Sequence, residues 1–325
     1  MLQLQLFAMT DQDIPAPATQ MNNGIDIQID FQCALPSLSV IRVTGEDRLT
    51  FLHSQLTRDL HQLDNDQASM TAWCNPKGRV IATLLLCRRD SHIDLIVASD
   101  LKEAVLKKLR MFVLRARVEL EDCESLSCLG LGGAAAESLL GETTATVPMA
   151  EWRLGEMDDL AVVAIPGPAA RFLIYGDREA VDSLARKAAS ACPPVDASWW
   201  TLLNIETGLP WIDHAVSELL LPQMLNLDQI GGLDFNKGCY PGQEVIARLH
   251  YRGEVKQRLH YGRSTATELA PGAALYTNSG ERAGHIINSV ADGNKGGRCL
   301  AVISTTATTS LHLGDADGAA VEFST

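Results

Sequence analysis

The residues best suited to carry out chemistry lie around Cys239, in the stretch N-K-G-C-Y-P-G-Q-E-V-I-A-R. Cys239 follows Lys237 by two positions and precedes Pro241, which suits the first turn of a helix. Gln243 and Glu244 fit the charge preference of a helix start. A nearby lysine and a helix N-terminus both stabilise a thiolate, the form of cysteine that is nucleophilic and binds metals. Two interpretations stay open here: a reactive, exposed thiolate, and a buried structural cysteine in a tight turn.

Other residue combinations with chemical potential are weak. The eight histidines are scattered, with only His250 and His260 sharing one basic stretch, so the sequence predicts no metal site. No G-x-S-x-G turn is present to hold the serine of a hydrolase triad. Gly130 and Gly132 approach a dinucleotide-binding fingerprint, but no βαβ unit surrounds them. We therefore interpret these glycines as part of an ordinary turn between a strand and a helix.

Composition and charge exclude several classes of protein. The chain of 325 residues has 27 Lys and Arg against 40 Asp and Glu, a net charge of −13, which argues against a protein that coats nucleic acid. Hydrophobic residues make up 46% of the chain, enough for the cores of about two domains. The eight cysteines show no C-x-x-C spacing and are expected to be reduced thiols. No cation precedes Arg42 and no long apolar run occurs, so we expect a cytoplasmic protein without a membrane partner.

Local patterns predict the elements that must position Cys239. Leucines 49, 52, 56 and 60 lie on one face of a helix that Thr44 is expected to cap. The turn sequence N-P-K-G at 75–78 separates two apolar strands and predicts a β-hairpin. Gly208 is expected to end a helix over 198–207. Further predicted strands cover 39–43, 92–98, 117–120, 126–133 and 171–175, and further helices cover 101–113, 134–140 and 178–191.

The order of these elements predicts an α+β protein with a separate C-terminal module. From Leu259 onward, short alternating strands are separated by turns, which is typical of a barrel of about five or six strands. We expect a flexible tail over 1–29, an α+β region of two interleaved subdomains over 30–245, and a β-barrel over 246–325.

The octapeptide K-G-C-Y-P-G-Q-E at 237–244 resembles the K-G-C-Y-x-G-Q-E signature of the YgfZ family of folate-binding proteins. These proteins are relatives of the glycine-cleavage T-protein, an aminomethyltransferase. The resemblance extends to F-L-H-S-Q-L-T-R-D at 51–59, C-N-P-K-G-R at 74–79, L-N-I-E-T-G-L-P at 203–210 and P-Q-M-L-N-L at 222–227. It therefore covers residues 38–252 and implies a T-protein-like ring of α+β domains around a folate channel, with a C-terminal β-barrel.

The resemblance also implies a function. A family member of this kind is a tetrahydrofolate-binding accessory protein, rather than an enzyme, for the assembly or repair of iron–sulfur clusters. Its expected partners are folate and iron–sulfur proteins such as tRNA methylthiotransferases. Cys239 would be the catalytic thiolate or a transient cluster ligand, with no resident metal, and Lys237 would keep the thiolate ionised.

The folate-binding residues are expected by the same resemblance. Trp200 matches a tryptophan that the family uses to contact folate, although the neighbouring Trp199 competes for the role; an indole stacks well on a flat ring. Leu38 stands where the family has a second tryptophan. The remaining expected folate contacts are Tyr240, Gln243, Glu244 and Arg252.

Two alternatives stay open. One is a folate-dependent aminomethyltransferase or demethylase, which needs a carboxylate where this chain has Thr83. The other is a scaffold that binds a partner protein or tRNA. Residues 102–117 carry six cations and one acid, and residues 237–263 carry six cations and two acids. The first run is interpreted as a solvated helix face. The second could meet the anionic tail of a folate.

Overall fold

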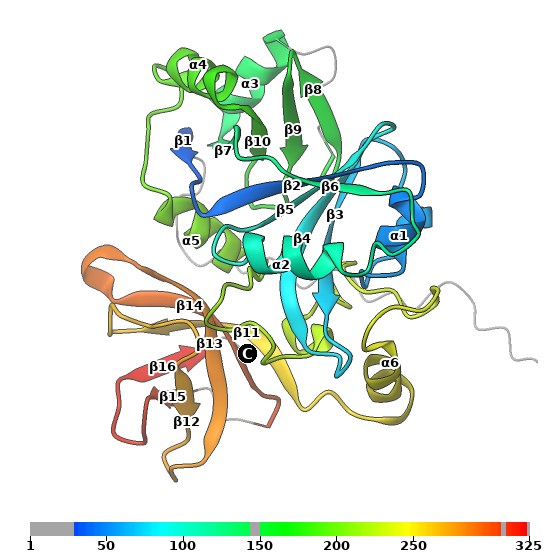
Figure 1. Ribbon diagram of the computed structural model, residues 1–325. Coiled ribbons are helices and arrows are strands. Elements are labelled where there is room, and N and C mark those ends of the chain that lie inside the picture. The colour runs from blue at the N-terminus through cyan, green and yellow to red at the C-terminus, as the bar shows by residue number, and fades with distance from the viewer. Residues whose placement is uncertain (1–28, 144–149, 307–309, 324–325) are drawn as a thin grey trace, which may run out of the picture.

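The computed structural model describes residues 29–143, 150–306 and 310–323, which form two five-stranded sheets and a barrel (Figure 1). The tail expected over 1–29 falls, apart from Ile29, outside the described residues. Within the described ranges, no helix is long and apolar enough to cross a membrane.

The first sheet has the strand order β3-β4-β5-β2-β6 and is antiparallel throughout. Its strands are β2 (Leu38–Thr44), β3 (Gln67–Cys74), β4 (Val80–Arg88), β5 (Ile93–Ala98) and β6 (Glu119–Asp122). Strands β3 and β4 form the expected hairpin, and Gly78 in its turn has a φ of +74°. Helix α2 (Lys102–Arg110) packs its buried residues against this sheet.

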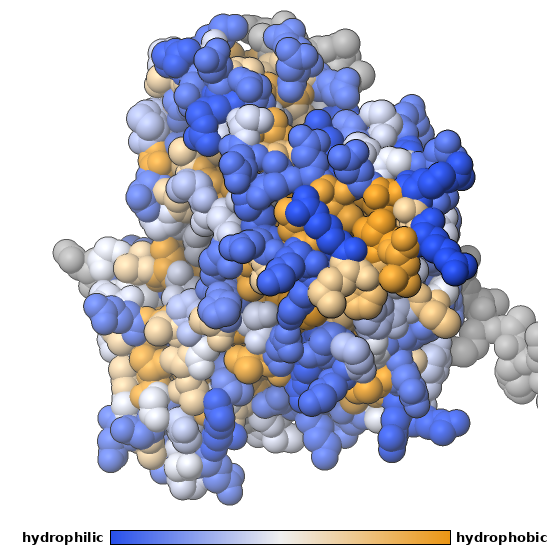
Figure 2. Space-filling model, viewed as in Figure 1, coloured by the Kyte–Doolittle hydropathy of each residue, from blue (hydrophilic) through white to orange (hydrophobic). Residues whose placement is uncertain are grey.

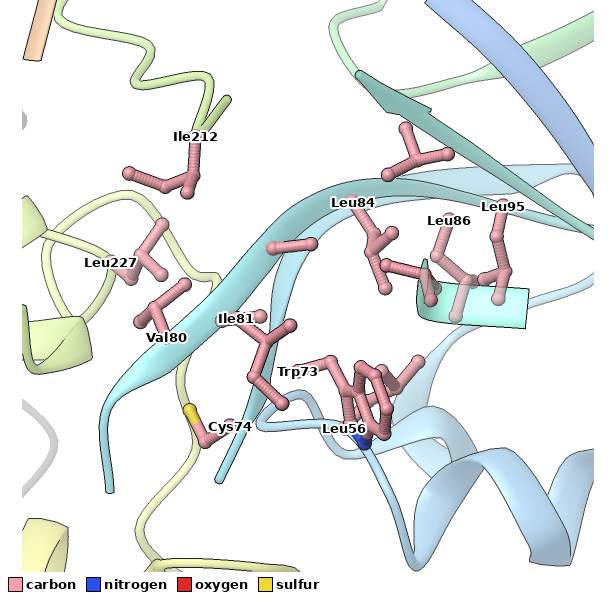
Figure 3. Packing of buried hydrophobic residues seen from close by; sticks show 14 of the residues in the cluster. Leu56, Trp73, Cys74, Val80, Ile81, Leu84, Leu86, Leu95, Ile212 and Leu227 are labelled. Atoms are coloured by element: carbon pink, nitrogen blue, oxygen red, sulfur yellow. The ribbon is translucent and has the colours of Figure 1, made fainter. Parts of the chain in front are cut away.

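The hairpin is buried on both of its faces, which explains why β4 is almost continuously apolar. Figure 3 shows Val80 on the side of Leu227 and Ile212, which belong to the segment 207–242. Ile81 lies on the other side, near Trp73. The hairpin therefore separates two parts of the core.

Helix α1 is shorter than the leucine spacing predicts. It covers only Arg48–His53, and the residue at its N-cap is Asp47 instead of Thr44. After α1 the chain pairs with β3: the N–H of Thr57 donates to the carbonyl of Ala72 at 3.0 Å. Three of the leucines, Leu52, Leu56 and Leu60, are fully buried. They lie on α1, on the irregular segment after it and on the short 3-10 helix η1 (Leu60–Gln62), so their helical spacing reflects burial and not one continuous helix.

The second sheet has the order β1-β7-β10-β9-β8, with β1 (Phe31–Ala34), β7 (Leu126–Gly132), β8 (Leu154–Met157), β9 (Leu160–Ala164) and β10 (Arg171–Asp177). Helices α3 (Ala134–Thr143) and α4 (Arg178–Ala188) cover one face, and α5 (Ser198–Glu206) packs on the other (Figure 1). A Cβ added at Gly132 would lie 2.2 Å from the Phe31 ring, so this glycine serves close packing in an antiparallel sheet.

The C-terminal module is a closed barrel with the strand order β11-β14-β13-β12-β15-β16. Its strands are β11 (Gln257–Ser264), β12 (Ala274–Tyr276), β13 (Arg282–Ala291), β14 (Gly297–Ser304), β15 (Ser310–Leu313) and β16 (Ala320–Phe323). The six strands confirm the expected barrel. Helix α6 (Gln243–Arg252), which precedes it, spans the expected domain boundary at 245/246. The short 3-10 helices η2 (Pro222–Leu225) and η3 (Gly293–Lys295) complete the described elements.

Candidate functional site

Cys239 is exposed, whereas the seven other cysteines are buried. Burial raises the pKa of Cys33, Cys128 and Cys299 to about 12, which keeps these thiols protonated and inert at neutral pH. The structure therefore excludes the buried interpretation of Cys239 and leaves it as the thiol that a ligand or partner can reach.

Lys237 anchors the loop that carries Cys239. Its Nζ donates to the carbonyl oxygens of His53 at 2.6 Å, Leu56 at 2.5 Å and Arg58 at 3.0 Å. An ammonium group has three N–H donors, so no donor remains for the Cys239 thiolate. Burial lowers the pKa of Lys237 to about 8. These hydrogen bonds fasten the loop to the end of α1, and the role of Lys237 in keeping the Cys239 thiolate ionised stays a prediction.

The β3–β4 hairpin supports the same loop from another side. Gly242, the N-cap residue of α6, has a φ of +81°, and a Cβ added there would lie 2.5 Å from both the Asn75 oxygen and the Gly78 Cα. Only glycine fits this close approach without strain. The motif at 74–79 and the octapeptide at 237–244 are thus in direct contact, and Gln243 begins the helix that follows Cys239.

His53, which the sequence interpretation did not single out, lies against this loop. His53 Nε2 would be 3.2 Å from a Cβ added at Gly238, and His53 Nδ1 lies 3.3 Å from the Asp59 carboxylate. The His61 ring is 4.4 Å from the His53 ring. Burial first, then the charges of Lys237 and His61, lower the pKa of His53, so its neutral form is favoured at pH 7. Its only sequence signal was its place within the family segment at 51–59.

Trp200 lies on α5 and is 4% exposed. It lines a narrow cavity of about 10 Å³, roughly the space of one water molecule, together with Asn204 and two further tryptophans, Trp152 and Trp211. Trp199 lies apart from this cavity and meets Phe31 edge to face at 6.3 Å. Of the two competing tryptophans, Trp200 is therefore the one that lines this cavity.

The expected folate residues fall into two groups. Trp200 and Leu38 belong to one apolar cluster, whereas Tyr240 is buried in the other, under the Lys237 ammonium at 4.9 Å. The hairpin β3–β4 contributes residues to both clusters. On α6, Gln243 is half-buried, while Glu244 and Arg252 are exposed. The cavity at Trp200 has no lining residue from 237–252, so the six expected residues do not surround one cavity.

Thr83 is fully buried, and its Oγ1 accepts a hydrogen bond from the Ile212 N–H at 2.9 Å. A hydroxyl committed to the backbone cannot act as the carboxylate that aminomethyl transfer needs. Across the described ranges, no group of three or more His, Cys, Asp or Glu side chains could hold a metal ion.

The two basic runs are partly neutralised. In the first, Lys102 pairs with Asp122 and Lys108 with Glu218, and in the second, Arg258 pairs with Asp228. Arg248 and Arg252 on α6 are exposed. Beyond the end of α2, the exposed side chains of Met111, Phe112 and Leu114 lie in a region where Figure 2 shows an apolar patch.

Comparison with known proteins first defines the class. Residues 33–176 match the GCVT N-terminal domain. The glycine cleavage system aminomethyltransferase T from Bartonella henselae superposes with a TM-score of 0.76 at 16% identity, over 91% of this chain and 85% of that one. At this identity the likeness shows the fold, which is that of the T-protein aminomethyltransferases.

The family follows from closer relatives. The tRNA-modifying protein YgfZ of Yersinia pestis is 31% identical over 261 residues, 79% of each chain, and that of Yersinia enterocolitica is 30% identical over the same length. The chain belongs to the YgfZ family.

Proposed function

We propose that this protein is a tetrahydrofolate-binding accessory protein that supports iron–sulfur enzymes of tRNA modification, such as those that methylthiolate tRNA, through cluster assembly or repair. The relatives named tRNA-modifying proteins support the link to tRNA modification. The observation that carries the proposal is the exposure of Cys239 alone among eight cysteines, on a loop that Lys237 fastens to the end of α1.

In this proposal Cys239 is the reactive thiolate, and it acts as a nucleophile or as a transient ligand to a cluster that the partner carries. Folate, when bound, supplies a carrier for a one-carbon unit. The cavity at Trp200 is the expected place for the flat ring, because it combines indole surfaces with the polar Asn204. Its volume of about 10 Å³ is that of one water molecule, so the proposal requires the side chains that line it to move apart before a ring can enter.

The test replaces Cys239 by alanine in a bacterial strain that lacks its own YgfZ protein, with methylthiolated tRNA measured by mass spectrometry. We expect the variant to fail to restore methylthiolation. Cys299→Ala is the matched control, since this cysteine is buried in the barrel core, and we expect it to restore the modification. Full restoration by Cys239→Ala would refute the role of Cys239.

Two further measurements separate the alternatives. Tetrahydrofolate-dependent turnover of an aminomethyl donor that survives Cys239→Ala would replace the proposal by aminomethyl transfer, although Thr83 offers no carboxylate for it. Calorimetric titration with tetrahydrofolate that gives no saturation at millimolar concentration would favour a scaffold without folate.

A further inference from the structure

Helix α6 carries an exposed tyrosine within a cluster of aromatic rings. Phe235 and His250 stack with ring centres 3.6 Å apart and an angle of 10° between their planes. Tyr251 meets both rings edge to face, with its ring centre 6.5 Å from that of Phe235 and 4.7 Å from that of His250. Tyr251 is 63% exposed, more than any other Phe, Trp or Tyr side chain in the described ranges. The cluster therefore holds the Tyr251 ring in place while much of its surface stays open to solvent.

Two exposed arginines share the solvent side of α6 with this ring. Arg248 precedes Tyr251 by three positions and Arg252 by four, and side chains at these spacings are neighbours on a helix surface. Both arginines are exposed, and among the described residues neither has a carboxylate oxygen within 4.0 Å. By contrast, Arg258, beyond the helix, pairs with Asp228 at 2.7 Å. The guanidinium groups of Arg248 and Arg252 are therefore available to an anionic ligand.

The local charge suits a short anionic segment rather than a long one. The stretch 244–256 has three cations, Arg248, Arg252 and Lys256, against the two acids Glu244 and Glu254, whereas the whole chain has a net charge of −13. Coating a duplex takes many cations, because each phosphate contact neutralises one charge. This surface can therefore hold a few phosphates and not a long duplex.

The same surface adjoins the loop that carries Cys239. Phe235 precedes Cys239 by four positions, and α6 begins four positions after it, at Gln243. Figure 1 shows α6 at the edge of the molecule, and Ile246 is the one residue of this helix that is buried. A ligand on the exposed side of α6 is therefore close to the loop of the exposed thiol.

We propose that the exposed side of α6 binds an unpaired loop of RNA, with a base stacked on Tyr251 and phosphates on Arg248 and Arg252. Unpaired bases stack on aromatic rings and on the planar guanidinium of arginine, and phosphates form charge-assisted hydrogen bonds with arginine. An acidic protein segment uses the two arginines but leaves the tyrosine ring without a stacking partner, so the aromatic cluster favours a nucleic acid. The choice of RNA over DNA rests on the proposed function, whose enzymes modify tRNA. The protein then contacts the RNA itself and not only the enzyme.

The test measures, by fluorescence anisotropy, the binding of the full chain to a fluorescein-labelled RNA hairpin with a loop of about seven nucleotides. A blunt RNA duplex without a loop is the comparison probe. Wild-type protein is expected to bind the hairpin at least about fivefold more tightly than the duplex, which is the gain from one stacked base. Tyr251→Ala is expected to lose this preference and Tyr251→Phe to keep it, because phenylalanine retains the ring. Phe112→Ala is the matched control and is expected to keep the preference, since Phe112 is the other exposed aromatic side chain among the described residues.

The arginines have a separate readout, the dependence of binding on salt. Each phosphate contact to a single strand contributes about 0.7 to the slope of log Kd against log salt concentration. Arg248→Gln combined with Arg252→Gln is therefore expected to lower that slope by about 1.4 between about 50 and 200 mM KCl. Lys107→Gln combined with Arg115→Gln is the matched control, because both side chains are exposed and the change in net charge is the same. This control is expected to leave the slope near the wild-type value.

The outcomes separate this inference from the proposed function. If wild-type protein does not bind the hairpin, or binds hairpin and duplex equally, the RNA surface is overturned, while the role of Cys239 is decided by tRNA methylthiolation alone. Equal effects of the two double variants on the salt slope would also overturn it, because the loss would then come from net charge. Displacement of the hairpin by polyglutamate with equal efficiency per charge would assign the surface to an acidic protein segment instead. Tighter binding of a DNA hairpin of the same sequence would overturn the choice of RNA.

Discussion

Replacing Gly242 by alanine is expected to weaken the contact between the β3–β4 hairpin and the loop that carries Cys239. Gly242 has a φ of +81°, and its added Cβ would lie 2.5 Å from the Asn75 oxygen and from the Gly78 Cα. Gly280→Ala is the matched control, because Gly280 has a φ of +80° but nothing lies within 4 Å of its added Cβ. Both variants therefore bear the free-energy cost of alanine at a positive φ, but only Gly242→Ala also disturbs a contact, the one with the β3–β4 hairpin.

The expected magnitudes follow from these distances. Alanine at a positive φ costs about 1 kcal/mol, and both variants bear that cost. At Gly242 the two backbones must also separate until the contact reaches an ordinary distance, and overpacking of this kind costs about 1–3 kcal/mol more. We expect the free energy of unfolding to fall by about 2–4 kcal/mol in Gly242→Ala and by about 1 kcal/mol in Gly280→Ala.

Urea unfolding followed by tryptophan fluorescence measures both losses. Hydrogen exchange supplies a local readout. The amides of Asn75, Lys77, Gly78 and Arg79 are expected to exchange faster in Gly242→Ala than in wild type, and at the wild-type rate in Gly280→Ala. Equal losses of stability in the two variants would refute the contact between the hairpin and the Cys239 loop.

Three further predictions concern single positions. Burial, with Lys237 and His61, lowers the pKa of His53 below 6.5, so the unfolded chain takes up this proton at a higher pH than the folded one. Stability is then expected to fall as the pH drops below about 6.5. In His53→Gln the fall in Tm between pH 7 and 5 is expected to be shallower than in wild type. An unchanged slope would contradict this prediction. Leu114 has a φ of +38° and is 89% exposed, so Leu114→Gly is expected to gain about 1 kcal/mol in urea unfolding, and a loss would count against the strain. Thr83→Val leaves the buried Ile212 N–H without its acceptor and is expected to lose about 1–3 kcal/mol in the same assay, whereas no loss would mean that water or another group replaces the hydroxyl.

The features that sequence predicts well in this protein are local ones. The turn at 75–78 and the end of α5 at Gly208 both follow from a few adjacent residues with special backbone preferences. The barrel follows from alternation and turns repeated over 257–323. The octapeptide marked Cys239 as the residue to examine, and the structure leaves that thiol exposed.

Helix α1 shows where local sequence patterns no longer predict the structure. The leucine spacing of 3, 4 and 4 is helical, yet the helix ends at His53, because the chain beyond it pairs with β3. Burial alone set the spacing, and burial does not require a helix. Carbonyl oxygens at the end of this helix and in the segment after it accept the hydrogen bonds of Lys237 Nζ.

Sequence by itself determined the family, the antiparallel hairpin and barrel, and the candidate thiol. Tertiary structure decided what each charged group near the site does. Lys237 is two positions from Cys239, yet its three hydrogen bonds go to carbonyls about 180 positions earlier. The sequence pattern of Arg171 is that of an ordinary strand residue, yet Arg171 is buried beside Trp200, and among the described residues no carboxylate pairs with it as Glu206 pairs with Arg298. The physical reason is that desolvation and ion pairing depend on which distant segments pack around a group, and neighbours in sequence do not specify that packing.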